Sequence, residues 1–118
     1  MGANLDNLPE NVKKKIIDLQ NLQIQLQNLR NTHDFLQSQK NETELAIEEL
    51  EKATPETTVY KSMGGILVRT TRDKLLDEKK SLKISTEMRI KTVKQKEERS
   101  LQTLENMKKS LQSELQQK

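Results

Sequence analysis

Apolar residues recur at steps of three or four along two long segments, which lie on either side of a short central stretch. The first stripe, which includes a few polar members, consists of Val12, Ile16, Leu19, Leu22, Leu26, Leu29, His33, Leu36, Lys40, Thr43, Ile47 and Leu50. The second carries Leu75, Leu76, Leu82, Ile90, Val93, Leu101, Leu104, Met107, Leu111 and Leu115. This spacing gathers the side chains on one helix face and is typical of a coiled-coil seam.

Helix-breaking residues bound these segments and do not interrupt them. Pro9 suits the start of a helix, where its missing N–H costs nothing, and Pro55 disfavours helix in the residue before it. We therefore expect helices over residues 9–54 and 73–118. The candidate cap residues are Asn7 or Leu8 for the first helix and Thr70, Thr71 or Asp73 for the second.

Two details of the pattern admit a second interpretation. Residues 22–27 alternate between apolar and polar side chains, which is also the period of a strand, but Leu and Gln favour helix and no turn signal flanks them. In the second segment, an eleven-residue repeat would leave a helix pair nearly straight. The members of this repeat are Leu82, Val93, Leu104 and Leu115.

The central stretch, residues 57–70, is the only part of the chain rich in β-branched residues. Its paired glycines, Gly64 and Gly65, suit the positive φ angles of a two-residue hairpin turn. With the turn there, Val59 faces Thr70, Lys61 faces Val68 and Met63 faces Ile66, so that one face is mostly apolar. The pattern predicts a β-hairpin within residues 55–72.

A lone two-stranded hairpin is marginally stable in water, because its edges lack partners and its apolar face lacks cover. The flanking helices are too polar to supply that cover. We therefore expect the hairpin to associate with other chains. The residues expected at this contact are Val59, Tyr60, Lys61, Met63, Gly64, Gly65, Ile66, Leu67 and Val68.

A tight hairpin between two helices of near-equal length folds the second back along the first, as an antiparallel coiled coil. Both ends of the chain then meet at one tip, where residues 1–8 lead into the first helix. Apolar side chains at this tip have one partner helix only. We expect these side chains either to bind apolar segments of another protein or only to close the end of the coiled coil. They are Leu5, Leu8, Val12, Ile16, Met107, Leu111 and Leu115.

Composition supports extended helices over a compact core. Only 31% of the 118 residues are hydrophobic, 2% are aromatic and 33% are charged. Low hydrophobicity also suits disorder, but the periodic apolar stripes favour helices. Residues 1–53 carry six Lys and Arg against nine acids, whereas residues 73–118 carry twelve against eight. These opposite net charges suit two antiparallel helices.

The chain offers no set of residues for catalysis, and we expect no enzyme activity, cofactor or metal. There is no cysteine, and the single histidine, His33, lies at a seam position. Gly64 and Gly65 lack the following Lys-Ser/Thr of a phosphate-binding loop. The acidic run at Glu48, Glu49 and Glu51 fits a solvated helix face.

Neither a membrane nor a nucleic acid is an expected partner. No apolar run approaches the roughly 20 residues that span a bilayer, and the first residues lack the pattern of a signal peptide. The pI is about 9.1, yet the basic residues of the second helix alternate with glutamates and few aromatic rings are available for stacking. With no cysteine, the chain fits a reducing cytoplasm.

Residues 59–69, Val-Tyr-Lys-Ser-Met-Gly-Gly-Ile-Leu-Val-Arg, resemble the hairpin signature of beta-type subunits of the prefoldin family, in particular archaeal ones. The opening at residues 9–12, Pro-Glu-Asn-Val, is similar too. The single hairpin is typical of the beta type, since alpha-type subunits have two. The chain departs from common members in its Asn- and Gln-rich first helix.

This resemblance implies a hexamer of two alpha-type and four beta-type subunits, whose hairpins assemble into a β-barrel that carries six coiled-coil arms. It further implies an ATP-independent cytoplasmic chaperone that holds unfolded client proteins at the tips of the arms and passes them to a group II chaperonin. Residues 1–118 would form one subunit. A structural or tethering coiled-coil protein without chaperone activity is the alternative.

Overall fold

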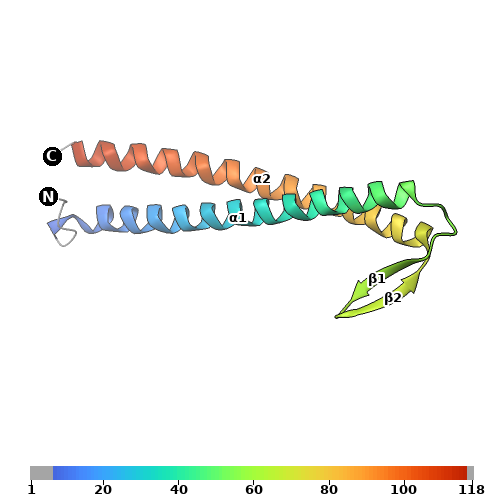
Figure 1. The fold of residues 1–118 in the computed structure, drawn as a ribbon. Helices are drawn as coiled ribbons and strands as arrows, with labels where there is room; N and C mark the ends of the chain where they lie inside the picture. Colours follow the sequence, from blue (N-terminus) through green and yellow to red (C-terminus); the bar gives the residue numbers. More distant parts are fainter. Residues whose placement is uncertain (1–6, 117–118) are drawn as a thin grey trace. The chain divides into compact units, whose positions relative to one another are not determined.

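The computed structural model describes residues 7–116, which fold as two long helices with a two-stranded antiparallel hairpin between them in the chain (Figure 1). The elements are α1 (Glu10–Lys52), β1 (Val59–Met63), β2 (Ile66–Thr70) and α2 (Arg72–Gln116). The predicted combination of helix, hairpin and helix is confirmed. Residues 22–27 are helical, so the strand interpretation of their alternating pattern is wrong.

The described residues form two compact units, which we consider separately. The terminal unit contains the first part of α1, up to Thr32, and the last part of α2, from Val93 onward. The hairpin unit is His33–Thr92 and contains the end of α1, both strands and the start of α2.

Each helix begins at a residue that satisfies its first free N–H groups. For α1 this residue is Pro9, whose carbonyl oxygen accepts hydrogen bonds from the N–H groups of Val12 and Lys13, both at 3.0 Å. The cap therefore lies one or two residues later than predicted, because the cap residue is the one whose carbonyl accepts the first bonds of the helix. For α2, the Thr71 hydroxyl accepts a hydrogen bond from the Lys74 N–H at 3.2 Å, which confirms one of the three candidates.

The apolar stripe predicted for α1 is confirmed, since each of its members is buried or half-buried. Leu36 is fully buried, and the polar member Thr43 is only 5% exposed. The Thr43 hydroxyl donates a hydrogen bond to the Gln39 carbonyl at 2.7 Å, so its burial leaves no donor unpaired.

The stripe predicted for α2 is partly wrong. Leu82, Leu101 and Leu115 are 44%, 43% and 45% exposed. Covered positions on α2 are instead filled in part by polar side chains: Lys79, Lys83, Thr86, Glu97 and Ser100. They continue the alternating steps of three and four that α1 uses, so the packing follows a seven-residue period and not the eleven-residue repeat of the leucines.

The core of the hairpin unit lies where the hairpin joins the helices. Leu50 at the end of α1 packs with Leu75 and Leu76 at the start of α2, and all three are at most 8% exposed. Ile47 and Val59 pack against this cluster. Here the end of α1, the start of β1 and the start of α2 are held together by apolar contact.

Ion pairs show that the helices of the hairpin unit run antiparallel. Glu44 of α1 pairs with Lys83 of α2 at 3.8 Å, and Glu51, further along α1, pairs with Lys80, which comes earlier in α2, at 3.7 Å. In both pairs the acid is on α1 and the base on α2, as the uneven charge of the two segments predicts. The side chains are exposed, so each pair contributes little stability.

Arg72 ties the two helices together at the base of the hairpin. Its Nε donates a hydrogen bond to the Leu50 carbonyl at 2.7 Å and its Nη2 donates one to the Glu51 carbonyl at 3.3 Å. These are among the last carbonyls of α1, which have no partners within the helix. The Arg72 side chain is only 18% exposed and also pairs with Asp73.

We predict that Arg72→Met lowers the free energy of unfolding by about 2 kcal/mol, because both carbonyls lose the charged donor and the Leu50 carbonyl keeps only the Ala53 N–H, at 3.3 Å. Urea unfolding followed by circular dichroism measures the change. The control is Arg69→Met, since Arg69 is exposed on β2. Equal unfolding midpoints for the Arg72 variant and the unmodified chain would contradict this role.

Candidate functional site

The hairpin has the predicted register. Val59 pairs with Thr70, Lys61 with Val68 and Met63 with Ile66. The turn is formed by Gly64 and Gly65, whose φ angles are 54° and 84°. Positive φ at both central positions is the geometry of the two-residue turn that matches the twist of paired strands, and it explains why two glycines stand there.

Apolar side chains are exposed on both faces of this hairpin. Leu67 is 71% exposed, and the others are Tyr60 at 56%, Met63 at 50%, Ile66 at 63% and Val68 at 40%. The sheet contains β1 and β2 only, so each strand has one edge with no partner strand within residues 7–116. We call these five side chains and the two open edges the hairpin surface.

The base of the hairpin is covered by its own helices, which the sequence did not predict. Val59 packs against the apolar cluster at the helix ends. Lys61 donates a hydrogen bond to Glu78 of α2 at 2.8 Å, through side chains that are 41% and 51% exposed. These contacts hold the first residues of the hairpin to the helices, and the hairpin surface beyond them stays open.

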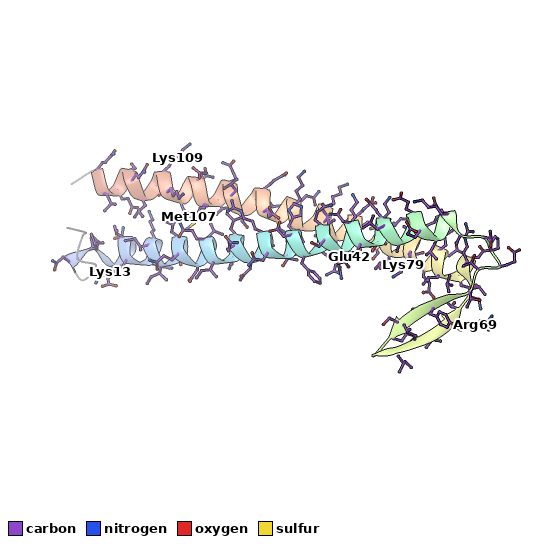
Figure 2. The ribbon with its side chains drawn as sticks, in the orientation of Figure 1. Lys13, Glu42, Arg69, Lys79, Met107 and Lys109 are labelled. Carbon is purple, nitrogen blue, oxygen red and sulfur yellow. The ribbon has the colours of Figure 1, made fainter. Side chains whose placement is uncertain are left out.

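The residues predicted at the tip divide by exposure. Leu5 lies outside the described residues, and Val12 is only 3% exposed. Leu8, Ile16, Met107 and Leu111 are half-buried, and Leu115 is 45% exposed. In Figure 2, Met107 points from α2 toward α1, whereas Lys109 points away. The described residues of this set therefore belong to the terminal unit, but mostly as part of its seam.

An ion pair joins the start of α1 to the end of α2 within the terminal unit. Lys15 Nζ donates hydrogen bonds to Glu114 Oε1 and, at 3.3 Å, to Ser110 Oγ. The second carboxylate oxygen of Glu114 is buried and has no hydrogen-bond partner among the described residues. This contact links the start of α1, where Val12 is covered, to the end of α2.

Comparison with known proteins identifies the family. The family model described as "Prefoldin subunit" matches residues 13–118. The chain belongs to the prefoldin family. A prefoldin subunit beta of Archaeoglobus fulgidus is 37% identical over 95 residues, which are 80% of this chain and 82% of that protein. One from Pyrococcus furiosus is 29% identical, over 94% of this chain and 95% of that protein.

Solved structures give the same result. The crystal structure of the prefoldin beta subunit from Thermococcus strain KS-1 matches with a TM-score of 0.81 and 28% identity, over 92% of this chain and 96% of that one. The predicted resemblance to archaeal beta-type prefoldin subunits is confirmed. The chain therefore has the chaperone function of a prefoldin subunit and assembles with other prefoldin subunits. A purely structural tether is not favoured.

Sequence reasoning missed two apolar residues of the terminal unit, Ile17 and Ile24, which are 55% and 60% exposed. They are seven residues apart and thus share one face of α1, away from the seam. Ile17 follows the seam residue Ile16 directly, and the apolar pattern does not say which of the two packs inward. The sequence held one signal for them, which is that both isoleucines lie outside the predicted stripe and are seven residues apart.

The described residues hold no cluster of three or more His, Cys, Asp or Glu side chains that could bind a metal ion. His33 is half-buried at its seam position. Among the same residues no helix is long and apolar enough to cross a membrane.

The turn geometry generates a prediction for Gly65. No atom lies within 4 Å of a Cβ built there, so only the backbone opposes a substitution. Gly65→Val should destabilise the hairpin by about 1–3 kcal/mol, because a β-branched residue is strained at positive φ. Gly65→Asn should cost less, since Asn tolerates this region. The cross-strand NOE between Lys61 and Val68 measures hairpin formation, and equal loss in both variants would contradict the argument.

Proposed function

We propose that this chain is one of four beta-type subunits that assemble with two alpha-type subunits into a hexamer, with the hairpins forming a shared β-barrel. The observation that carries the proposal is the hairpin surface, whose side chains are up to 71% exposed and whose strands have open edges. Strands from other subunits would pair with the open edges and would cover the exposed apolar side chains. A closed barrel of such strands has no edge left. The contact residues are those predicted, Val59, Tyr60, Lys61, Met63, Gly64, Gly65, Ile66, Leu67 and Val68.

In this proposal residues 1–118 act as one subunit, in which 1–8 form the tip, 9–54 and 73–118 the helices and 55–72 the hairpin linker. The subunit holds non-native proteins without ATP and passes them to a group II chaperonin. The proposed client contacts are Leu5, Leu8, Val12, Ile16, Met107, Leu111 and Leu115. Partial exposure at several of these positions supports weak contacts, which several subunits would combine through high effective concentration.

No catalytic step belongs to this function, and it uses no cofactor and no nucleic acid. The basic residues support this, because several of them engage acids of the chain itself, as Lys61, Lys80 and Lys83 do. A cytoplasmic location, which the absence of cysteine fits, stays a prediction.

We predict that Ile66→Ser combined with Leu67→Ser weakens assembly with alpha-type subunits about tenfold or more, because the apolar area that the barrel would bury is lost. Size-exclusion chromatography with light scattering gives the mass of the product.

The matched control is Ile84→Ser combined with Met88→Ser. These residues lie on α2 of the same unit and are 63% and 66% exposed, against 63% and 71% for the hairpin pair. The control should assemble normally. A full-mass assembly from the hairpin variant would contradict a role of the hairpin in joining subunits.

For the client contacts, we predict that Leu8→Ser combined with Leu115→Ser reduces suppression of thermal aggregation of citrate synthase by roughly twofold to fivefold, while the assembly keeps its mass. Light scattering of the heated enzyme measures the effect. Leu82→Ser is the control, since Leu82 is 44% exposed and Leu115 is 45% exposed. Undiminished suppression by the double variant would count against client binding at these positions.

A further inference from the structure

Residues 19–29 of α1 carry no charged side chain, although a third of the chain is charged. The segment reads Leu-Gln-Asn-Leu-Gln-Ile-Gln-Leu-Gln-Asn-Leu and lies between Asp18 and Arg30. All of it belongs to the terminal unit. Exposed helix faces in this chain usually carry Lys and Glu, so an uncharged face of amides and aliphatic side chains is distinct in chemistry.

A shallow groove of about 310 Å³ runs along this face, lined by Gln25, Asn28, Leu29 and Thr32. Gln25, Asn28 and Thr32 are exposed and Leu29 is half-buried. We call these four residues the amide groove.

The polar groups of the amide groove are largely unused. The Thr32 hydroxyl donates to the Asn28 backbone carbonyl at 3.0 Å. The side-chain amides of Gln25 and Asn28 have no hydrogen-bond partner within the described part of the chain, whereas Gln27, further round the helix, bonds to Asn31 at 3.0 Å. Each free amide offers both donors and an acceptor beside an aliphatic surface.

We propose that the amide groove binds an extended segment of a non-native polypeptide. Gln25 and Asn28 would bond peptide N–H and C=O groups, while Leu29 would contact an apolar side chain. The choice of occupant follows from this chemistry, because folded proteins pair their own peptide groups and only a non-native chain presents them free together with apolar side chains. The inference rests on the proposed holdase function and adds a second contact region to it.

The missing charge has a functional consequence. A groove without charge neither attracts nor repels a segment according to its net charge, so acidic and basic clients can bind it alike. A nucleic acid is a poor occupant, since residues 19–29 offer no cation to its phosphates.

The test places charge in the groove without changing its shape, by Gln25→Glu combined with Asn28→Asp in the complete assembly with alpha-type subunits. The probes are two permanently unfolded proteins, reduced and alkylated α-lactalbumin, which is acidic, and reduced and alkylated lysozyme, which is basic. Fluorescence anisotropy gives the Kd of each. The variant should bind the acidic probe about tenfold more weakly at low salt, because like charges now meet at close range. The loss should shrink at high salt, and binding of the basic probe should not weaken.

The matched control is Gln20→Glu combined with Gln23→Glu, which adds the same charge to the same uncharged segment. Both residues are exposed, and Gln23 lies about 160° around the helix from Gln25 at 3.6 residues per turn. This control should bind the acidic probe within about twofold of the unmodified assembly.

Two results would overturn the inference. If the groove variant binds the acidic probe as the control does, the groove does not contact clients. If the variant instead changes the mass of the assembly, the face is a contact between subunits. Failure of the unmodified assembly to bind either probe would refute the proposed holdase function itself, which is a separate and recognisable outcome.

Discussion

The fold depends on a sheet that is too small to satisfy itself. Two strands of five residues each leave an open edge on either side, and the side chains at the turn, Met63 and Ile66, remain half or more exposed. Isolated hairpins of this size are marginal in water, so this one gains stability only through contacts beyond itself. The chain supplies some of them at the base of the hairpin through Val59 and Lys61. In the proposed hexamer, strands of other prefoldin subunits supply the rest.

The helices meet a different constraint, because a pair of helices offers each side chain only one partner surface. The seam of the helix pair consequently tolerates polar residues, such as Thr43 and Thr86, that a compact core would exclude. Local reinforcement occurs where this thin seam ends. At the hairpin it comes from the Leu50, Leu75 and Leu76 cluster with Arg72, and in the terminal unit from the ion pair of Lys15 and Glu114.

The sequence predicted the features whose physics is local. The paired glycines defined the turn and hence the register, and the spacing of apolar residues defined the seam of α1. The seam of α2 was harder, since its leucines follow an eleven-residue repeat while the packing keeps the period of α1. Leu82 is therefore exposed, and Thr86 is 2% exposed at a position that polarity alone would assign to the surface.

The sequence alone could not show which candidate site residues are exposed and which are packed, for similar reasons. Apolar residues near the chain ends were expected to be partly exposed, but Val12 is only 3% exposed, in a unit whose helix ends are also joined by Lys15 and Glu114. Between Ile16 and Ile17, only the phase of the helix decides which one faces the seam. Arg72 was not recognised because its partners are backbone carbonyls of a helix that ends twenty residues earlier in the chain.

The central claim is that the hairpin acquires its missing partners from other prefoldin subunits. Amide hydrogen exchange of residues 57–70, measured in the isolated chain and after assembly with alpha-type subunits, tests it most directly. Strong new protection of β1 and β2 on assembly is the predicted result, since the open edges then pair. Assembly to full mass with unchanged exchange across both strands would contradict it.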